Sequence, residues 1–173
     1  ISLLLKSSDK PGIIWSLYDD SERLVHQLRF DQSGKLLYYF NGTIAHSCNL
    51  LKVNDGHVHH ITAAYNGFSS TMQINIDGHE CNTTKDVLWN STSEGFSIAL
   101  GGTQKMLEEQ GLEGCISKFG VFTFPLSVDE IDLVRHDYYL GLTPKVTSLM
   151  GSSKWVNSSR SDGQYSAPVL TST

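Results

Sequence analysis

The segment Asp55–Cys81 constrains the fold more than any other part of this sequence. It reads DGHVHHITAAYNGFSSTMQINIDGHEC and holds two strand-like runs, 58–65 and 71–77, around the turn-rich residues 66–70. Hydrophobic residues alternate with polar ones from position 72 to 76, the period of a strand with one buried face. Asp77-Gly78 predicts a tight hairpin, because glycine accepts a positive φ without steric cost. A short strand carrying Cys81 follows, and such a meander needs other strands beside and behind it.

The remainder of the sequence reads as short strands separated by polar turns. Apolar or alternating runs occupy residues 1–5, 13–18, 24–30, 35–40, 96–100 and 115–124. The turns between them are rich in Ser, Asp and Gly, as in Ser33-Gly34. Many short strands at regular spacing predict an all-β antiparallel sandwich of two sheets.

A helix is predicted near residues 127–137. Ser127 and Glu130 have the spacing of a capping box, in which each side chain bonds the other residue's backbone N–H. Leu126 and Ile131 occupy the positions of a hydrophobic staple. Gly141, followed by a proline three residues later, ends the segment.

The length of 173 residues suits one full hydrophobic core and is short for two. We therefore expect one β-sandwich domain over residues 1–143 and a Ser-rich tail or linker over residues 144–173. No apolar run approaches the ~18–20 residues of a membrane helix, so we expect no membrane insertion by this segment. The first residues lack the features of a signal peptide, and we interpret Ile1 as an internal position of a longer chain.

The asparagines indicate the compartment. Four of the eight lie in N-x-S/T sequons, which is more than chance placement would give: Asn41, Asn82, Asn90 and Asn157. These sequons predict a glycosylated, secreted or cell-surface protein. The three cysteines, Cys48, Cys81 and Cys115, cannot all pair with one another within the chain.

Several motifs together resemble the laminin G-like modules, a group that also includes thrombospondin N-terminal and pentraxin-like domains. The segment 12–17, GIIWSL, resembles a strand of that family with its preceding glycine turn, and Leu28 to Leu36 resembles its next paired strands. The segment 55–59 matches the pattern D-G-x-W-H except that Val58 replaces tryptophan. Residues 72–78 resemble the strand that ends in D-G, and 112–116 resemble the closing G-C-I signature. The resemblance covers about residues 1–140.

The resemblance implies a jelly-roll sandwich of the concanavalin A-like type. It implies a disulfide between Cys81 and Cys115, which leaves Cys48 either as a buried thiol or as the partner of a cysteine outside this sequence. The family usually has strands before the position equivalent to Ile1, so we expect the sequence to begin inside the domain.

Many modules of this family bind calcium at an acidic loop on one rim of the sandwich. The corresponding loops here carry Asp19, Asp20 and Glu22 on one side and Asn90 and Glu94 on the other. Calcium prefers several oxygen ligands that converge from loops. The family's usual acidic position aligns with Arg23 or Leu24, neither of which is an acid. We expect these five residues to form a binding rim. Calcium is the candidate ion, but the absence of an acid at the family's usual position leaves its ligands unassigned.

Two kinds of chemistry are not favoured by the sequence. His57, His59 and His60 resemble a zinc-binding trio, but on a strand His60 points away from the other two. Related sandwiches include glycoside hydrolases, whose acids alternate along a strand, whereas Glu108, Glu109 and Glu113 lie in a loop. No nucleophile elbow or phosphate-binding glycine loop is present. We predict that the protein is not an enzyme.

The predicted function is a non-catalytic adhesion or recognition module of a larger extracellular protein, which binds a protein partner through its loop rim or a sheet face. A calcium-dependent, lectin-like module that binds glycans and a purely architectural spacer are the alternatives. With a net charge of −5 and 13 scattered basic residues, the chain lacks the clustered cations that heparin requires. We expect no nucleic-acid partner.

Overall fold

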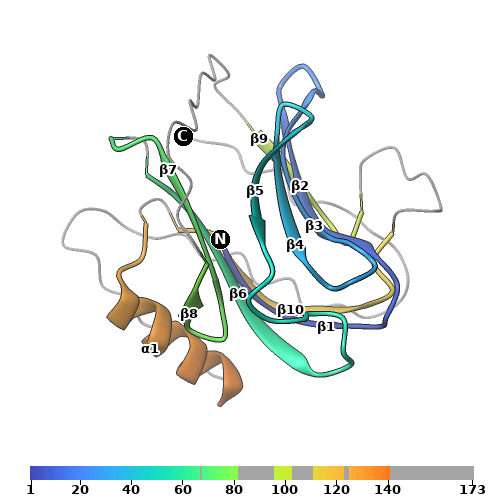
Figure 1. The fold of residues 1–173 in the computed structure, drawn as a ribbon. Helices are drawn as coiled ribbons and strands as arrows, with labels where there is room; N and C mark the ends of the chain where they lie inside the picture. Colours follow the sequence, from blue (N-terminus) through green and yellow to red (C-terminus); the bar gives the residue numbers. More distant parts are fainter. Residues whose placement is uncertain (67, 82–95, 103–110, 123–124, 141–173) are drawn as a thin grey trace.

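The computed structural model describes residues 1–66, 68–81, 96–102, 111–122 and 125–140. Within these residues the chain forms two antiparallel five-stranded sheets that pack face to face, with one helix on the outside (Figure 1). The predicted all-β sandwich of jelly-roll type is confirmed. No helix in the described residues is both long enough and apolar enough to cross a membrane.

The sheet nearer the helix, called sheet A, has the strand order β10-β1-β6-β7-β8. Its strands are β1 (Ser2–Ser7), β6 (Val58–Asn66), β7 (Thr71–Ile76), β8 (His79–Glu80) and β10 (Gly114–Gly120). The first strand therefore lies between two strands that come much later in the chain. Its neighbours β6 and β10 both run antiparallel to it.

The second sheet, called sheet B, has the strand order β5-β4-β3-β2-β9. Its strands are β2 (Gly12–Asp19), β3 (Leu24–Phe30), β4 (Leu36–Phe40), β5 (Thr43–Cys48) and β9 (Phe96–Leu100). Strand β5 was not predicted from the sequence. It is an edge strand whose composition, Thr-Ile-Ala-His-Ser-Cys, is too polar to show a strong strand pattern.

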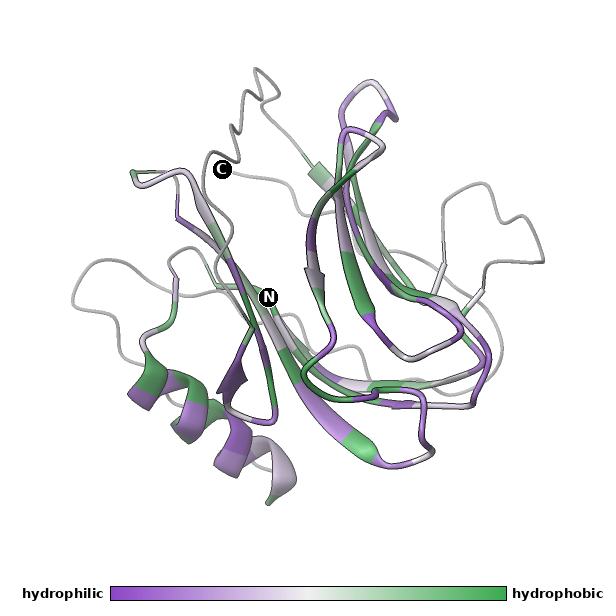
Figure 2. Ribbon diagram, in the orientation of Figure 1, coloured by the Kyte–Doolittle hydropathy of each residue, from purple (hydrophilic) through white to green (hydrophobic). Residues whose placement is uncertain are grey.

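The core lies between the two sheets and follows the predicted alternation. Met72, Ile74 and Ile76 of β7 are buried, and they face Leu28 and Phe30 of β3 within one apolar cluster. The alternation of hydrophobic and hydrophilic positions is visible along the strands in Figure 2. Burying each such side chain contributes about 1.5–3 kcal/mol, which is why register is fixed by this face.

The predicted helix is present as α1 (Val128–Tyr139), two residues longer than expected at its C-terminal end. The capping box is formed, with the Ser127 hydroxyl accepting from the Glu130 N–H and the Glu130 carboxylate accepting from the Ser127 N–H. The helix covers the outer face of sheet A, where Ile131 and Val134 pack on Leu4 of β1 (Figure 1). Leu126, the other staple residue, joins this second apolar cluster.

The predicted Cys81–Cys115 disulfide is wrong. The bond joins Cys48 to Cys81, and Cys115 is a free, exposed thiol. Cys81 follows β8 at one edge of sheet A, and Cys115 lies on β10 at the other edge. Four strand spacings separate these edges, about 19 Å. A disulfide requires Cα atoms within about 7 Å. Cys48 ends the edge strand of sheet B, so the bond links the two sheets.

Candidate functional site

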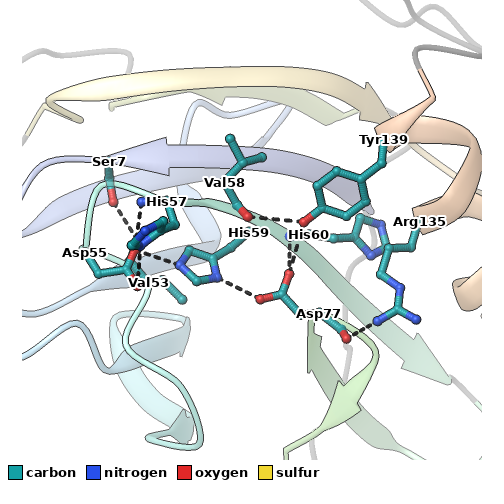
Figure 3. A network of polar contacts seen from close by, with 10 residues as sticks. All are labelled: Ser7, Val53, Asp55, His57, Val58, His59, His60, Asp77, Arg135 and Tyr139. Carbon is teal, nitrogen blue, oxygen red and sulfur yellow. Dashed lines mark hydrogen bonds and ion pairs between the residues drawn. The ribbon is translucent and has the colours of Figure 1, made fainter.

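A network of polar contacts lies at the end of the sandwich where β6 begins (Figure 3). It contains the segment Asp55-Gly56-His57-Val58-His59, the motif that resembled D-G-x-W-H. The Asp55 carboxylate accepts the backbone N–H of His57 at 2.8 Å, which closes a turn on the side chain itself. Gly56 has a φ of 81°, so the turn uses the conformation that glycine allows.

His59 lies between two carboxylates. Its Nδ1 is 2.7 Å from Asp77 Oδ2, and its Nε2 is 3.0 Å from Asp55 Oδ1. Ionised carboxylates only accept hydrogen bonds, so both ring nitrogens donate when His59 carries two protons. The side chain is only 10% exposed. The geometry therefore favours a positively charged imidazolium held by two negative groups.

Asp77 connects this pair to the helix. Its Oδ1 accepts the backbone N–H of His60 at 2.7 Å, and its backbone carbonyl accepts from the Arg135 guanidinium of α1. Tyr139, also on α1, donates to the Val58 carbonyl at 3.1 Å and lies 3.4 Å from Asp77 Oδ1. One aspartate at the β7–β8 turn thus joins β6, the turn and the helix (Figure 3).

The charges of this group shift its protonation. The hydrogen bond that His59 donates to Asp77, with a second that it donates to Asp55, raises the pKa of His59 above its ordinary value although burial opposes this. Burial favours the neutral form of Asp77, but hydrogen bonds from His59 and His60 outweigh it and lower the pKa of Asp77. Burial likewise opposes ionisation of Asp55. Hydrogen bonds from the backbone N–H of His57 and from the imidazoles of His59 and His57 outweigh burial and lower the pKa of Asp55.

This arrangement holds His59 in place and occupies both of its ring nitrogens. A general base needs a free lone pair, and both nitrogens of His59 are occupied. His60 points to the other face of the sheet, where it bonds Ser2 Oγ at 2.8 Å and packs edge-on with the Tyr138 ring.

In the described residues no group of three or more His, Cys, Asp or Glu side chains could hold a metal ion. The hollow beside the helix is shallow and is lined by Asp77, Arg135, His136, Tyr139 and Leu140.

The predicted acidic rim is divided by the structure. Asp19 is buried, and its carboxylate accepts the N–H of Ser21 at 3.0 Å and of Arg23 at 2.8 Å. Its second oxygen pairs with the Arg23 guanidinium at 2.7 Å. Burial opposes ionisation of Asp19, but these contacts with Arg23 lower its pKa. Asp20 and Glu22 are exposed on the same loop, whereas Asn90 and Glu94 lie outside the described residues.

The described part of this loop does not fit a calcium site. A calcium ion needs several free oxygen ligands. Asp19 is already committed to an arginine, and a guanidinium within the loop repels a second cation. That the rim binds a partner remains a prediction.

Of the four sequons, one lies in the described residues. Asn41 occupies the β4–β5 hairpin turn, where Asn41 and Gly42 have φ values of 47° and 78°. This is the Asn-Gly pairing that two-residue hairpins favour. The side chain is exposed and accessible to modification. Asn82, Asn90 and Asn157 lie outside the described residues.

Comparison with known proteins places the chain in a family. A laminin G family model, described as the concanavalin A-like lectin/glucanases superfamily, matches residues 5–132. The chain belongs to this family. Comparison with curated protein sequences gave no significant match.

Solved structures share this laminin G-like fold at low sequence identity. A heptameric SAP-like pentraxin from Limulus polyphemus has a TM-score of 0.61 at 18% identity, covering 77% of this chain and 67% of the pentraxin. Domains LG4-5 of the mouse laminin alpha1 chain give 0.56 at 18%, covering 74% and 36%. The full extracellular region of zebrafish Gpr126/Adgrg6 gives 0.52 at 12%, covering 76% and 19%. The chain thus spans about a third and a fifth of the last two structures, and these likenesses concern the fold.

Proposed function

We propose that this laminin G-like module is a non-catalytic recognition module of a larger extracellular or cell-surface protein and binds a protein partner. The observation that carries this proposal is the saturated Asp55–His59–Asp77 cluster. The most prominent group of ionisable side chains in the described residues holds the strands and the helix together. A module whose polar cluster is used in this way is suited to present a rigid surface.

Two features support an extracellular location. Disulfides persist mainly in oxidising compartments, and the Cys48–Cys81 bond is built into the core. Asn41 offers a sequon on an exposed turn, the kind of position that glycosylation requires. The fold is shared with domains of a laminin chain and of a receptor's extracellular region, which is in keeping with this assignment.

A lectin-like activity is the second candidate, favoured by the family description, which includes lectins. Calcium dependence is the weaker part of this alternative, because Arg23 neutralises Asp19 in the loop. An architectural spacer remains the third candidate and predicts that neither proteins nor glycans bind.

The discriminating experiment uses the full chain, secreted from mammalian cells and made multivalent by fusion to an Fc fragment. It is applied to an array of extracellular proteins and to a glycan array, each with calcium and with EDTA. We expect saturable binding to a protein in both conditions. Binding to glycans alone, abolished by EDTA, would replace this proposal with the lectin. Absence of binding on both arrays would favour the spacer.

A further inference from the structure

The outer face of sheet B carries a mixed cationic and apolar surface near its β5 edge. Strand register places Arg29 of β3 beside Leu37 of β4 and Leu37 beside Ser47 of β5. In the adjacent row Tyr39 of β4 lies beside Ile44 of β5. We call these five residues the β3–β5 patch.

The patch faces away from the core. Leu28 and Tyr38, the strand neighbours of Arg29 and Tyr39, belong to the buried cluster between the sheets. Successive side chains on a strand point to opposite faces, so the patch residues point outward. Ile44 is 57% exposed, and Ser47 is also exposed.

Arg29 lacks a carboxylate partner in the described residues. The other two arginines there have one, since Arg23 pairs with Asp19 and Arg135 pairs with Asp132 at 3.0 Å. Arg29 instead lies over the Tyr39 ring, with its guanidinium carbon 5.8 Å from the ring centroid. Its Nε is shielded from solvent and has no hydrogen-bond partner within that part of the chain. An unsatisfied donor of this kind costs free energy, and no carboxylate of the described residues pairs with the guanidinium.

The surroundings of Arg29 indicate what would reach it. A guanidinium fixed over an aromatic ring presents a planar fork that matches a carboxylate. In a chain with a net charge of −5 the patch is a local cation, which is complementary to an acidic side chain. Ile44, Leu37 and Tyr39 supply apolar contact beside it, and Arg and Tyr are enriched at the centre of protein interfaces.

A sugar fits this surface less well than a protein segment does. Sugars commonly bind by stacking on an aromatic face, and the guanidinium of Arg29 lies over the Tyr39 ring. Ile44 and Leu37 are branched aliphatic side chains, which pack against apolar side chains.

We propose that the β3–β5 patch docks a segment of a protein partner, with a glutamate or aspartate of that segment bound to Arg29 and an apolar side chain packed on Ile44 and Leu37. This inference deepens the proposed function and rests on it, because it names the surface and the chemistry of the partner. It differs from the acidic rim in sign: the rim would attract a cation, whereas the patch attracts an anion.

The test uses NMR on the full chain, in which the Nε–H signal of each arginine can be followed. The probe is an acetylated, amidated hexapeptide of alternating leucine and glutamate, and the matched probe has glutamine in place of glutamate. We expect the glutamate peptide to shift the Arg29 Nε–H signal and to bind about tenfold more tightly than the glutamine peptide. Arg29→Gln should abolish the difference between the peptides. Lys10→Gln, which removes an exposed cation paired with Glu113, should preserve it.

A second variant keeps the test decisive if Arg29→Gln perturbs the fold. Ile44→Asp places a negative charge, the same sign as that of the glutamate peptide, on an exposed position of the edge strand. This variant should also weaken binding of the glutamate peptide by about tenfold. Equal affinity for both peptides, or shifts confined to residues outside the patch, would overturn the inference. Sodium glucuronate that shifts Arg29 at lower concentration than the peptide does would reassign the patch to acidic glycans. If a protein identified on the array binds the Arg29→Gln variant and the wild type equally, the recognition function stands but the β3–β5 patch is not the binding surface.

Discussion

His59 donates from Nδ1 to the carboxylate of Asp77 across 2.7 Å, and this bond joins positions 18 residues apart in the chain. Asp55 holds the other ring nitrogen of His59. Two of the sequence motifs that resemble the laminin G-like family, D-G-x-x-H and the strand ending in D-G, therefore meet at one imidazole. Their roles in the sequence are explained by this contact, because one motif supplies the histidine and an acid and the other supplies the second acid.

The stability of the module should depend on pH through His59. Its folded-state pKa is raised, so its contribution is fully present below the unfolded value of about 6.5 and is lost as pH rises through the folded pKa. We expect the contribution of His59 to the free energy of unfolding to fall as the pH rises above about 6.5. Urea unfolding of the wild type and of a His59 variant, measured at about pH 6 and at a series of higher pH values, isolates this contribution.

Variant His59→Gln should remove the alkaline loss and cost about 1–3 kcal/mol near neutral pH, because it breaks hydrogen bonds to two charged groups. Two other histidines contribute on the acidic side. Burial lowers the pKa of His26 and of His60 to about 4, so their contribution is complete above about pH 6.5 and is lost as pH falls toward 4. An alkaline loss that persists unchanged in His59→Gln would show that another group causes it.

The glycine of the G-C-I signature should not tolerate a side chain. A Cβ at Gly114 would overlap the backbone carbonyl of Lys6 and lie 2.8 Å from Cα of Ser7 on the paired strand β1. Backbone atoms cannot move aside, so Gly114→Ala should cost about 1–3 kcal/mol or more. The matched control is Gly111→Ala, whose Cβ would contact, among the described residues, only the Gly101 carbonyl at 3.9 Å. This variant should change stability by less than about 0.5 kcal/mol. Chemical denaturation of both variants decides the point, and equal stabilities would contradict it.

Peptide mapping without reduction should recover Cys48 joined to Cys81 and should label Cys115 as a thiol. The bond spans a sequence separation of 33, for which the chain-entropy relation gives about 3–4 kcal/mol. Replacing both Cys48 and Cys81 with alanine should therefore lower the free energy of unfolding by about that amount. Cys115→Ser serves as the control and should leave it nearly unchanged. Recovery of a Cys81–Cys115 peptide would contradict the structure.

In the rim loop, Asp19→Ala should lower the Tm, since it removes the acceptor for two backbone N–H groups and for Arg23. Glu22→Gln, at an exposed position on the same loop, should leave the Tm close to that of the wild type. This difference matters for any binding assay of the rim, because Asp19→Ala would change the loop as well as its charge. Equal Tm values for the two variants would show that the Asp19 contacts do not stabilise the loop.

Local patterns in the sequence were sufficient for much of the fold. Alternation located β7 and its buried face, and the capping box located the start of α1 at Ser127. Both depend on residues within a few positions of one another. The disulfide depends on the order of strands in the two sheets, which cysteine spacing does not contain. The error also had a local cause, since β5 is a polar edge strand and Cys48 was not assigned to a strand.

The sequence was less informative about the surface. Arg29 reads as an ordinary outward residue of an alternating strand, and only the structure reveals that it lacks a carboxylate partner in the described residues. The contacts of Asp19 were not foreseen for a related reason. An aspartate in a loop can be a ligand or can organise the loop, and the four-residue spacing to Arg23 was the one available indication of the second role.

The bond between Cys48 and Cys81 also sets how far the module can be drawn out by mechanical force. Residues between the two cysteines form a closed loop, which contains β6, β7 and β8. When tension on the chain unfolds the sandwich, the disulfide carries the force across this loop. Roughly 110–120 Å of chain therefore does not contribute to the extension. Reduction of the bond releases this length. The redox state of the Cys48–Cys81 pair thus determines the end-to-end length that the unfolded chain can attain under tension.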